Sequence, residues 1–84
     1  MNGKQRRILA LIFARPVPSG IRWAEIEALL IALGAERSKG RGSRVRFLLS
    51  DAEAVFHRPH PGPETDKGAV VSVREFLEKA GVKP

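Results

Sequence analysis

The stretch GRGSRVRFLLSDAEAVFH, residues 40–57, decides the fold. Polar and apolar side chains alternate along 43–49 and again along 52–57, which is the pattern of β-strands with one buried face. A glycine-containing turn precedes the first run and a Ser-Asp turn joins the two, so we expect antiparallel neighbours. A weaker candidate strand at 35–39 completes a three-stranded sheet, with one face packed and the other open.

Helical spacing occurs on both sides of this predicted sheet. Residues 4–14, about 22–33 and about 67–80 carry apolar side chains at intervals of three and four. Prolines end the first of these segments, and glycines directly follow the other two. The segment RPHPGPETD, 58–66, contains three prolines and is predicted to be a loop. The order helix, helix, three strands, helix indicates an α+β fold.

Length and composition limit the class of protein. With 84 residues, of which 43% are hydrophobic, the chain suits one domain with a thin core. We expect residues 1–20 to form an N-terminal helix and a proline-rich connection, and residues 21–84 the remainder of the domain. No cysteine is present, which excludes disulfides and thiolate chemistry, and two histidines are too few for a protein-only zinc site unless carboxylates add ligands. We therefore expect no metal and no cofactor.

No apolar run approaches the roughly 20 residues that span a membrane. The absence of cysteine suits the cytoplasm, where we expect the protein to act and to have no membrane partner.

The charge is strongly basic. The chain contains 15 Lys and Arg residues but only nine Asp and Glu residues. The resulting formal charge of +6 favours a nucleic-acid partner. A solubilising surface or a patch for an acidic protein is the alternative. Period-two spacing places Arg44 and Arg46 on the same side of their strand, about 7 Å apart at Cα, with Arg41 and Lys39 extending the row. The residues that we predict to bind RNA are Lys39, Arg41, Ser43, Arg44, Arg46 and Arg58.

The two histidines are candidates for proton transfer. His57 ends the last strand and is predicted to face the side of Arg44 and Arg46, and His60 lies between two prolines. Cleavage of RNA without metal needs a base, an acid and cations, and imidazole titrates near neutral pH. The alternative is that each histidine makes one hydrogen bond and no more. Glu25 and Glu27 diverge on their helix and do not suggest catalysis, and Trp23 is predicted to pack in the core.

Four segments, in this order, resemble the HicA toxins of bacterial toxin–antitoxin pairs. They are WAEIEALLIALGAE at 23–36, GRGSRVRF at 40–47, HRPHPG at 57–62 and KGAVVSVREFLEKAGV at 67–82. The resemblance covers about residues 22–83. It implies a double-stranded-RNA-binding-like α-β-β-β-α fold, here with an extra N-terminal helix. It also implies an mRNA interferase that a HicB antitoxin neutralises, with any oligomer forming through that antitoxin.

One position departs from the family pattern. The resemblance maps the family's catalytic histidine, which follows Gly-Ser in a "GSH" motif, onto Arg44. Arginine stays protonated and cannot act as a general base, and losing a positioned acid–base group typically slows a reaction by about 10²- to 10⁴-fold. Gly42 and Ser43 match the motif, and residues 59–62 match the family's "PHPG". Either the activity is lost, or His57 or His60 transfers the proton.

Three hypotheses remain open from the sequence. The first is a HicA-like toxin that binds mRNA and cleaves it by metal-independent transesterification. The second is a non-catalytic RNA- or DNA-binding module, whose binding weakens with salt. The third is a protein-interaction domain whose basic face is covered by an acidic partner, which is compatible with either of the other two.

Overall fold

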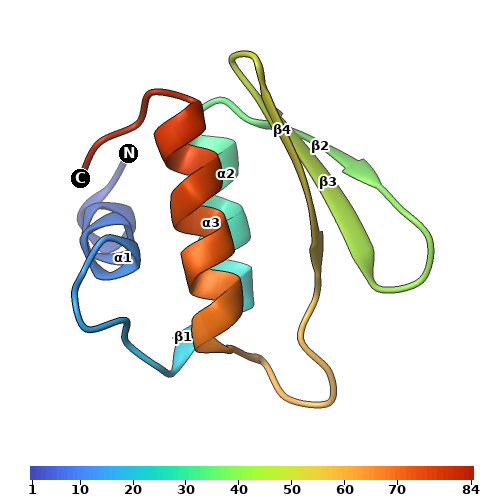
Figure 1. Cartoon of the computed structure of the whole chain (residues 1–84), viewed down its shortest axis with the longest axis horizontal. Helices are drawn as coiled ribbons and strands as arrows, with labels where there is room; N and C mark the ends of the chain where they lie inside the picture. Colours follow the sequence, from blue (N-terminus) through green and yellow to red (C-terminus); the bar gives the residue numbers. More distant parts are fainter.

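The computed structural model describes residues 1–84 as three helices and two small antiparallel sheets. The helices are α1 (Gly3–Ile12), α2 (Trp23–Ala32) and α3 (Lys67–Lys79), and the main sheet has the order β2 (Glu36–Lys39), β3 (Arg44–Leu49), β4 (Ala52–His57). Helices α2 and α3 cover one face of this sheet, and α1 lies on their far side (Figure 1). The predicted α+β fold, with an extra N-terminal helix, is confirmed.

The second sheet was not predicted. It pairs β1 (Ile21–Arg22) with β5 (Glu64–Thr65), so the prediction that 58–66 is entirely a loop is wrong at its end. Strand β5 begins directly after Pro63, the last proline of the segment, where backbone N–H groups become available for pairing. The Pro63 carbonyl also accepts a hydrogen bond from the backbone N–H of Trp23, at 3.0 Å. These contacts tie the start of α2 to the chain leading into α3.

The helix ends follow from local sequence. Asn2 and Gln5 form a capping box at α1, and the Asp66 carboxylate accepts a hydrogen bond from the backbone N–H of Ala69 at the start of α3, at 2.8 Å. Gly34, with φ of +100°, ends α2 in a conformation that side chains rarely adopt. None of the three helices combines the length and apolarity that a bilayer span requires.

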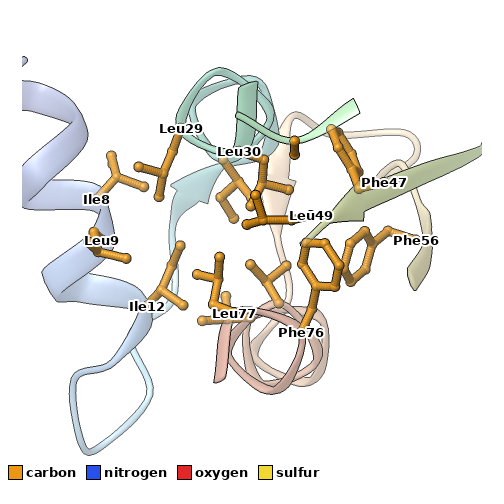
Figure 2. Close-up of a cluster of buried hydrophobic side chains, with 14 of the residues drawn as sticks. Ile8, Leu9, Ile12, Leu29, Leu30, Phe47, Leu49, Phe56, Phe76 and Leu77 are labelled. Atoms are coloured by element: carbon orange, nitrogen blue, oxygen red, sulfur yellow. The ribbon is translucent and has the colours of Figure 1, made fainter. Parts of the chain in front are cut away.

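A single cluster of 18 buried hydrophobic residues joins all three layers. Ile8, Leu9 and Ile12 bring α1 into contact with the same core that α2, α3 and the sheet share (Figure 2). On the sheet side, the predicted alternation of β3 is confirmed, because Val45, Phe47 and Leu49 are buried. The N-terminal helix is therefore packed on the domain.

Aromatic rings organise the part of the core next to the sheet. Phe56 of β4 meets Trp23 with ring centroids 5.7 Å apart and Phe76 at 5.8 Å, both edge-to-face. This is the arrangement that aromatic quadrupoles favour. Trp23 is thus a core residue, as predicted from its spacing.

The buried Arg74 of α3 fixes the end of α1. Its guanidinium donates to the carbonyl of Ile12 at 2.8 Å and to that of Ala14 at 2.9 Å. These carbonyls belong to the last turn of α1 and the residues after it, where the helix leaves acceptors unpaired and where its dipole favours a cation.

Candidate nucleic-acid interface

The outer face of the sheet, turned away from α2 and α3, carries the side chains Arg44, Arg46, Leu48, Glu53, Val55 and His57. Arg44 lies directly opposite His57 in the β3–β4 ladder, and paired residues of an antiparallel sheet share a face. The prediction that His57 faces the side of Arg44 is therefore confirmed by the register.

The backbone brings this pair especially close. The carbonyl of Arg44 accepts a hydrogen bond from the backbone N–H of Gly40 at 3.1 Å, so its polar backbone groups point toward β2. Arg44 and His57 then form a non-hydrogen-bonded pair, in which the Cα atoms approach to about 4.5 Å and the side chains lie closest. The two side chains therefore leave the sheet from directly opposite positions on an exposed surface.

The rest of the outer face is mixed. Nη1 of Arg46 lies 3.5 Å from Oε2 of Glu53, and both side chains are more than half exposed, so the pair contributes little to stability. Leu48 and Val55 are exposed apolar side chains in the same region. Positive charge is thus strongest at the Arg44–His57 end.

The turn from β2 to β3 requires glycine at position 40 for steric reasons. A Cβ on Gly40 would lie 2.9 Å from the Cβ of Arg44 and 3.2 Å from its carbonyl oxygen. The hairpin therefore needs glycine there to close, independently of any phosphate. The backbone carbonyl of Ser43, in the same turn, accepts a hydrogen bond from the backbone N–H of Arg58 at 2.9 Å, and Arg41 is exposed at the turn.

Lys39 does not extend the outer row of arginines. It pairs with the inward-facing Val45 and so shares the inner side of the sheet, which makes the predicted placement wrong. Strand β2 is exposed along its whole length, so its sequence carries no alternation that would reveal which side each residue takes. Arg58 also points inward, because it follows the outward-facing His57.

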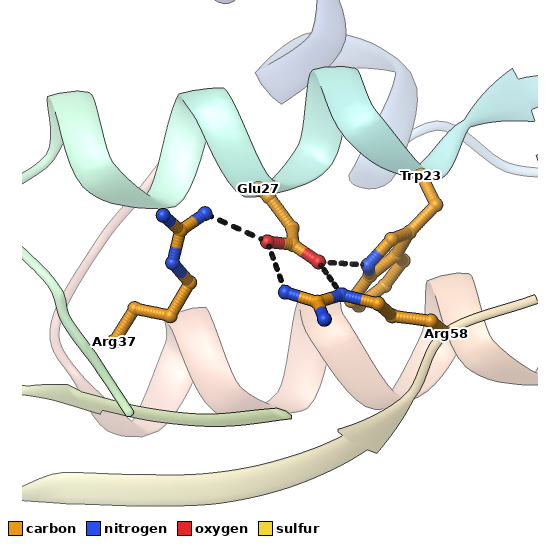
Figure 3. Close-up of polar contacts among 4 residues, drawn as sticks. All are labelled: Trp23, Glu27, Arg37 and Arg58. Carbon is orange, nitrogen blue, oxygen red and sulfur yellow. Dashed lines mark hydrogen bonds and ion pairs between the residues drawn. The ribbon is translucent and has the colours of Figure 1, made fainter. Parts of the chain in front are cut away.

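The inward-pointing Arg58 belongs to a cluster around a buried carboxylate, that of Glu27 on α2 (Figure 3). Oε2 of Glu27 accepts from Nε1 of Trp23 and from Nε of Arg58, the latter at 2.8 Å. Oε1 accepts from Nη2 of Arg58 at 3.3 Å and from Nη1 of Arg37 at 3.0 Å. The carboxylate thus fixes two guanidiniums from opposite edges of the sheet.

The electrostatics of this cluster favour the ionised pair. Burial alone would raise the pKa of Glu27, but hydrogen bonds from Arg58, Trp23 and Arg37, together with the charge of Arg58, outweigh it. The pKa of Glu27 therefore lies below its usual range. The hydrogen bond to Glu27 and its negative charge in turn raise the pKa of Arg58.

A hollow of about 500 Å³ opens beside the cluster, between α2 and the loop after β4. Its lining includes Arg22, Trp23, Glu27, Arg37, Arg58 and Pro59. Glu27 and Arg37 were not predicted from the sequence as members of a site. The available signal was that Glu27 stands four residues after Trp23, on the same helix face as an otherwise apolar stripe.

His60 is separate from both groups. It is exposed in the loop between β4 and β5, and its side chain takes part in no hydrogen bond or ion pair. The structure therefore brings Arg44, Arg46 and His57 together on one face and does not bring His60 to them by strand pairing.

Residues 23–82 match the model of the family described as HicA toxin of bacterial toxin-antitoxin. The chain belongs to the HicA toxin family. The match begins with α2 and ends just after α3, so α1 lies outside it. This family consists of RNase toxins from toxin–antitoxin systems. The match confirms the resemblance seen in the sequence. No curated protein and no solved structure matches the chain significantly.

Proposed function

We propose that this HicA family member binds mRNA on the outer face and cleaves it by metal-independent transesterification. The observation that carries the proposal is the direct cross-strand pairing of Arg44 with His57. The resemblance maps the family's histidine onto Arg44, and in a non-hydrogen-bonded pair such as Arg44 and His57 the Cα atoms lie about 4.5 Å apart. In this proposal the acid–base group is His57 on the neighbouring strand β4, and the permanent cation Arg44 stands on β3 where the resemblance places the family's histidine.

The chemistry assigns a separate task to each group. His57 accepts the proton of a ribose 2′-OH, and O2′ attacks the adjacent phosphorus as the bond from phosphorus to O5′ breaks. The leaving O5′ takes a proton from His60 or from water. The products are a 2′,3′-cyclic phosphate and a free 5′-hydroxyl. Arg44 and Arg46 stabilise the negative charge that builds up on the phosphate oxygens.

Cleavage of a labelled single-stranded RNA in excess EDTA tests the proposal. We expect product ends that carry 2′,3′-cyclic phosphate, and a fall in rate of about 10²- to 10⁴-fold for His57→Ala. His60→Ala and the double variant assign the second proton, and Arg6→Ala, an exposed change on α1, serves as the matched control. If the double variant cleaves as fast as the wild type, the histidine assignment is wrong.

The non-catalytic alternative rests on the resemblance, which maps the family's histidine onto Arg44. It predicts RNA binding without cleavage, with a log–log salt slope near −0.7 for each phosphate neutralised on a single strand. Binding that does not depend on salt would count against both proposals.

We further propose that residues 21–84 carry the RNA-binding part, with residues 1–20 as an added helix and connection, and that the protein acts in the cytoplasm. Its partner is a HicB-like antitoxin whose acidic surface covers the outer face. Expression of the toxin alone should arrest growth, and co-expression of a neighbouring antitoxin gene should relieve the arrest. Arrest that the neighbouring gene does not relieve would contradict the pairing.

A further inference from the structure

The lining of the hollow beside Glu27 is positively charged overall, although it includes a carboxylate. Glu27 accepts four hydrogen bonds, which use the roughly four acceptor positions that a carboxylate offers. Three arginines, Arg22, Arg37 and Arg58, line the same space, so positive charge remains in excess. Glu27 therefore holds Arg37 and Arg58 in place and offsets only part of the positive charge of the three arginines.

The arginine donors are only partly used. Arg58 commits two of its five N–H groups to Glu27, Arg37 commits one, and the Arg22 side chain takes part in no hydrogen bond or ion pair. Glu64, opposite Arg22 in the β1–β5 ladder, makes no ion pair with it. Guanidiniums that are fixed in place and keep free N–H pairs suit the bidentate recognition of a phosphate.

The remaining lining of the hollow is apolar. Ala24 and Ala28 of α2 line it on one side, and Pro59 and Pro63 line it on the other. A volume of about 500 Å³ lies within the range of pockets that hold small organic ligands. An anionic group joined to a flat apolar ring matches this combination better than a phosphate ion does, and a nucleotide has both parts.

A basic path leads from the hollow to the outer face. A smaller depression shares Arg37 and Arg58 with the hollow and continues along the inner side of the sheet to Lys39. Beyond Lys39 the chain turns through Arg41, and Arg44 follows on the outer side. A single strand that curls round this turn would meet cations along its whole course.

We infer that the hollow is a second RNA subsite, which holds one nucleotide of the same strand that is cleaved at Arg44 and His57. This inference rests on the proposed RNA-binding function and extends it from the outer face to the inner side. It assigns a role to Lys39 and Arg58, which the outer face does not use.

Trp23 makes the inference measurable, because it is the single tryptophan of the chain and lines the hollow. The full-length protein is titrated separately with adenosine 5′-monophosphate, adenosine and inorganic phosphate, and the Trp23 emission is recorded. We expect a saturable change with the monophosphate and weaker responses to its two parts. Arg22→Gln and Arg37→Gln should each weaken monophosphate binding about tenfold, the loss of one charge-assisted hydrogen bond. Arg6→Gln, on the far side of the helices, should leave it unchanged.

Several results would overturn the subsite. These are no saturable response to millimolar monophosphate, equal affinities for wild type and both hollow variants, and adenosine binding as tightly as the monophosphate. A response to a glutamate-rich peptide in place of the nucleotide would make the hollow a protein-docking site. Arg22 makes no side-chain contact that the fold needs, so its variant stays informative if Arg37→Gln unfolds.

The titration contains no RNA, so its outcome is independent of cleavage. A protein that cleaves RNA but shows no nucleotide response refutes the subsite alone. A protein that binds the monophosphate but neither binds nor cleaves RNA refutes the proposed function alone.

Discussion

Replacing Glu27 by glutamine tests the cluster that positions Arg37 and Arg58. Glutamine keeps an oxygen that can accept from Nε1 of Trp23, but it removes the charge that holds the two guanidiniums. Hydrogen bonds to charged groups contribute about 1.5–3 kcal/mol and neutral ones about 0.5–1.5 kcal/mol. We assign the full energy difference only to the hydrogen bond from Trp23. Both arginine side chains are nearly half exposed, so water can replace their contacts with Glu27.

The expected loss in the free energy of unfolding at pH 7 is therefore about 1–2 kcal/mol. In a domain of this size each kcal/mol lowers Tm by about 4–8 °C. The pKa of Glu27 is depressed in the folded state, so its contribution is complete above its unfolded pKa and is lost as the pH falls through its folded pKa. The difference between wild type and variant should therefore shrink below about pH 4.5.

Urea unfolding followed by Trp23 fluorescence, at pH 7 and at steps down to pH 3, measures both effects. Glu25→Gln is the matched control, since Glu25 lies on the same helix but forms a surface ion pair with Lys4. The control should lose less than about 1 kcal/mol. If Glu27→Gln unfolds at the wild-type midpoint with an unchanged acid profile, the cluster does not stabilise the fold in the way described.

Three further changes test other parts of the account. Glu53→Gln removes the carboxylate beside Arg46 and should strengthen RNA binding and steepen its salt dependence while leaving Tm nearly unchanged; weaker binding would show that RNA does not approach this face. Arg74→Met removes the donors to the Ile12 and Ala14 carbonyls and should destabilise the fold by about 1.5–3 kcal/mol, with faster hydrogen exchange in α1; unchanged exchange would contradict the role given to Arg74. Gly40→Ala places a Cβ against the Cβ and carbonyl of Arg44 and should lower the free energy of unfolding by about 1–3 kcal/mol, whereas an unaltered Tm would show that the turn relaxes freely.

The parts of the fold predicted from sequence are those with a strong local period. Alternation along β3 and β4 reveals which residues are buried, and a two-residue turn at Ser50 and Asp51 sets the register between them. The facing of Arg44 and His57 follows from these two facts alone. The three helices were likewise predicted to within two residues at each end, because their apolar stripes and caps are local.

The features that the sequence did not reveal depend on contacts between residues far apart in the chain. Glu27 meets Arg37 ten residues later and Arg58 thirty-one residues later, and no local pattern indicates which cation a buried carboxylate meets. The β1–β5 ladder joins two-residue strands more than forty positions apart. Lys39 was misplaced because an exposed edge strand has no hydrophobic alternation to fix which way its side chains point.

The role of His57 is tested most directly by the rate at which the purified full-length chain cleaves single-stranded RNA in EDTA, compared with that of His57→Ala. We expect metal-independent cleavage that leaves 2′,3′-cyclic phosphate ends, with a rate about 10²- to 10⁴-fold lower in the variant. Equal rates for the two proteins, or RNA binding by the wild type with no cleavage at all, would contradict the central claim that His57 replaces the family's histidine across the strand pair from Arg44.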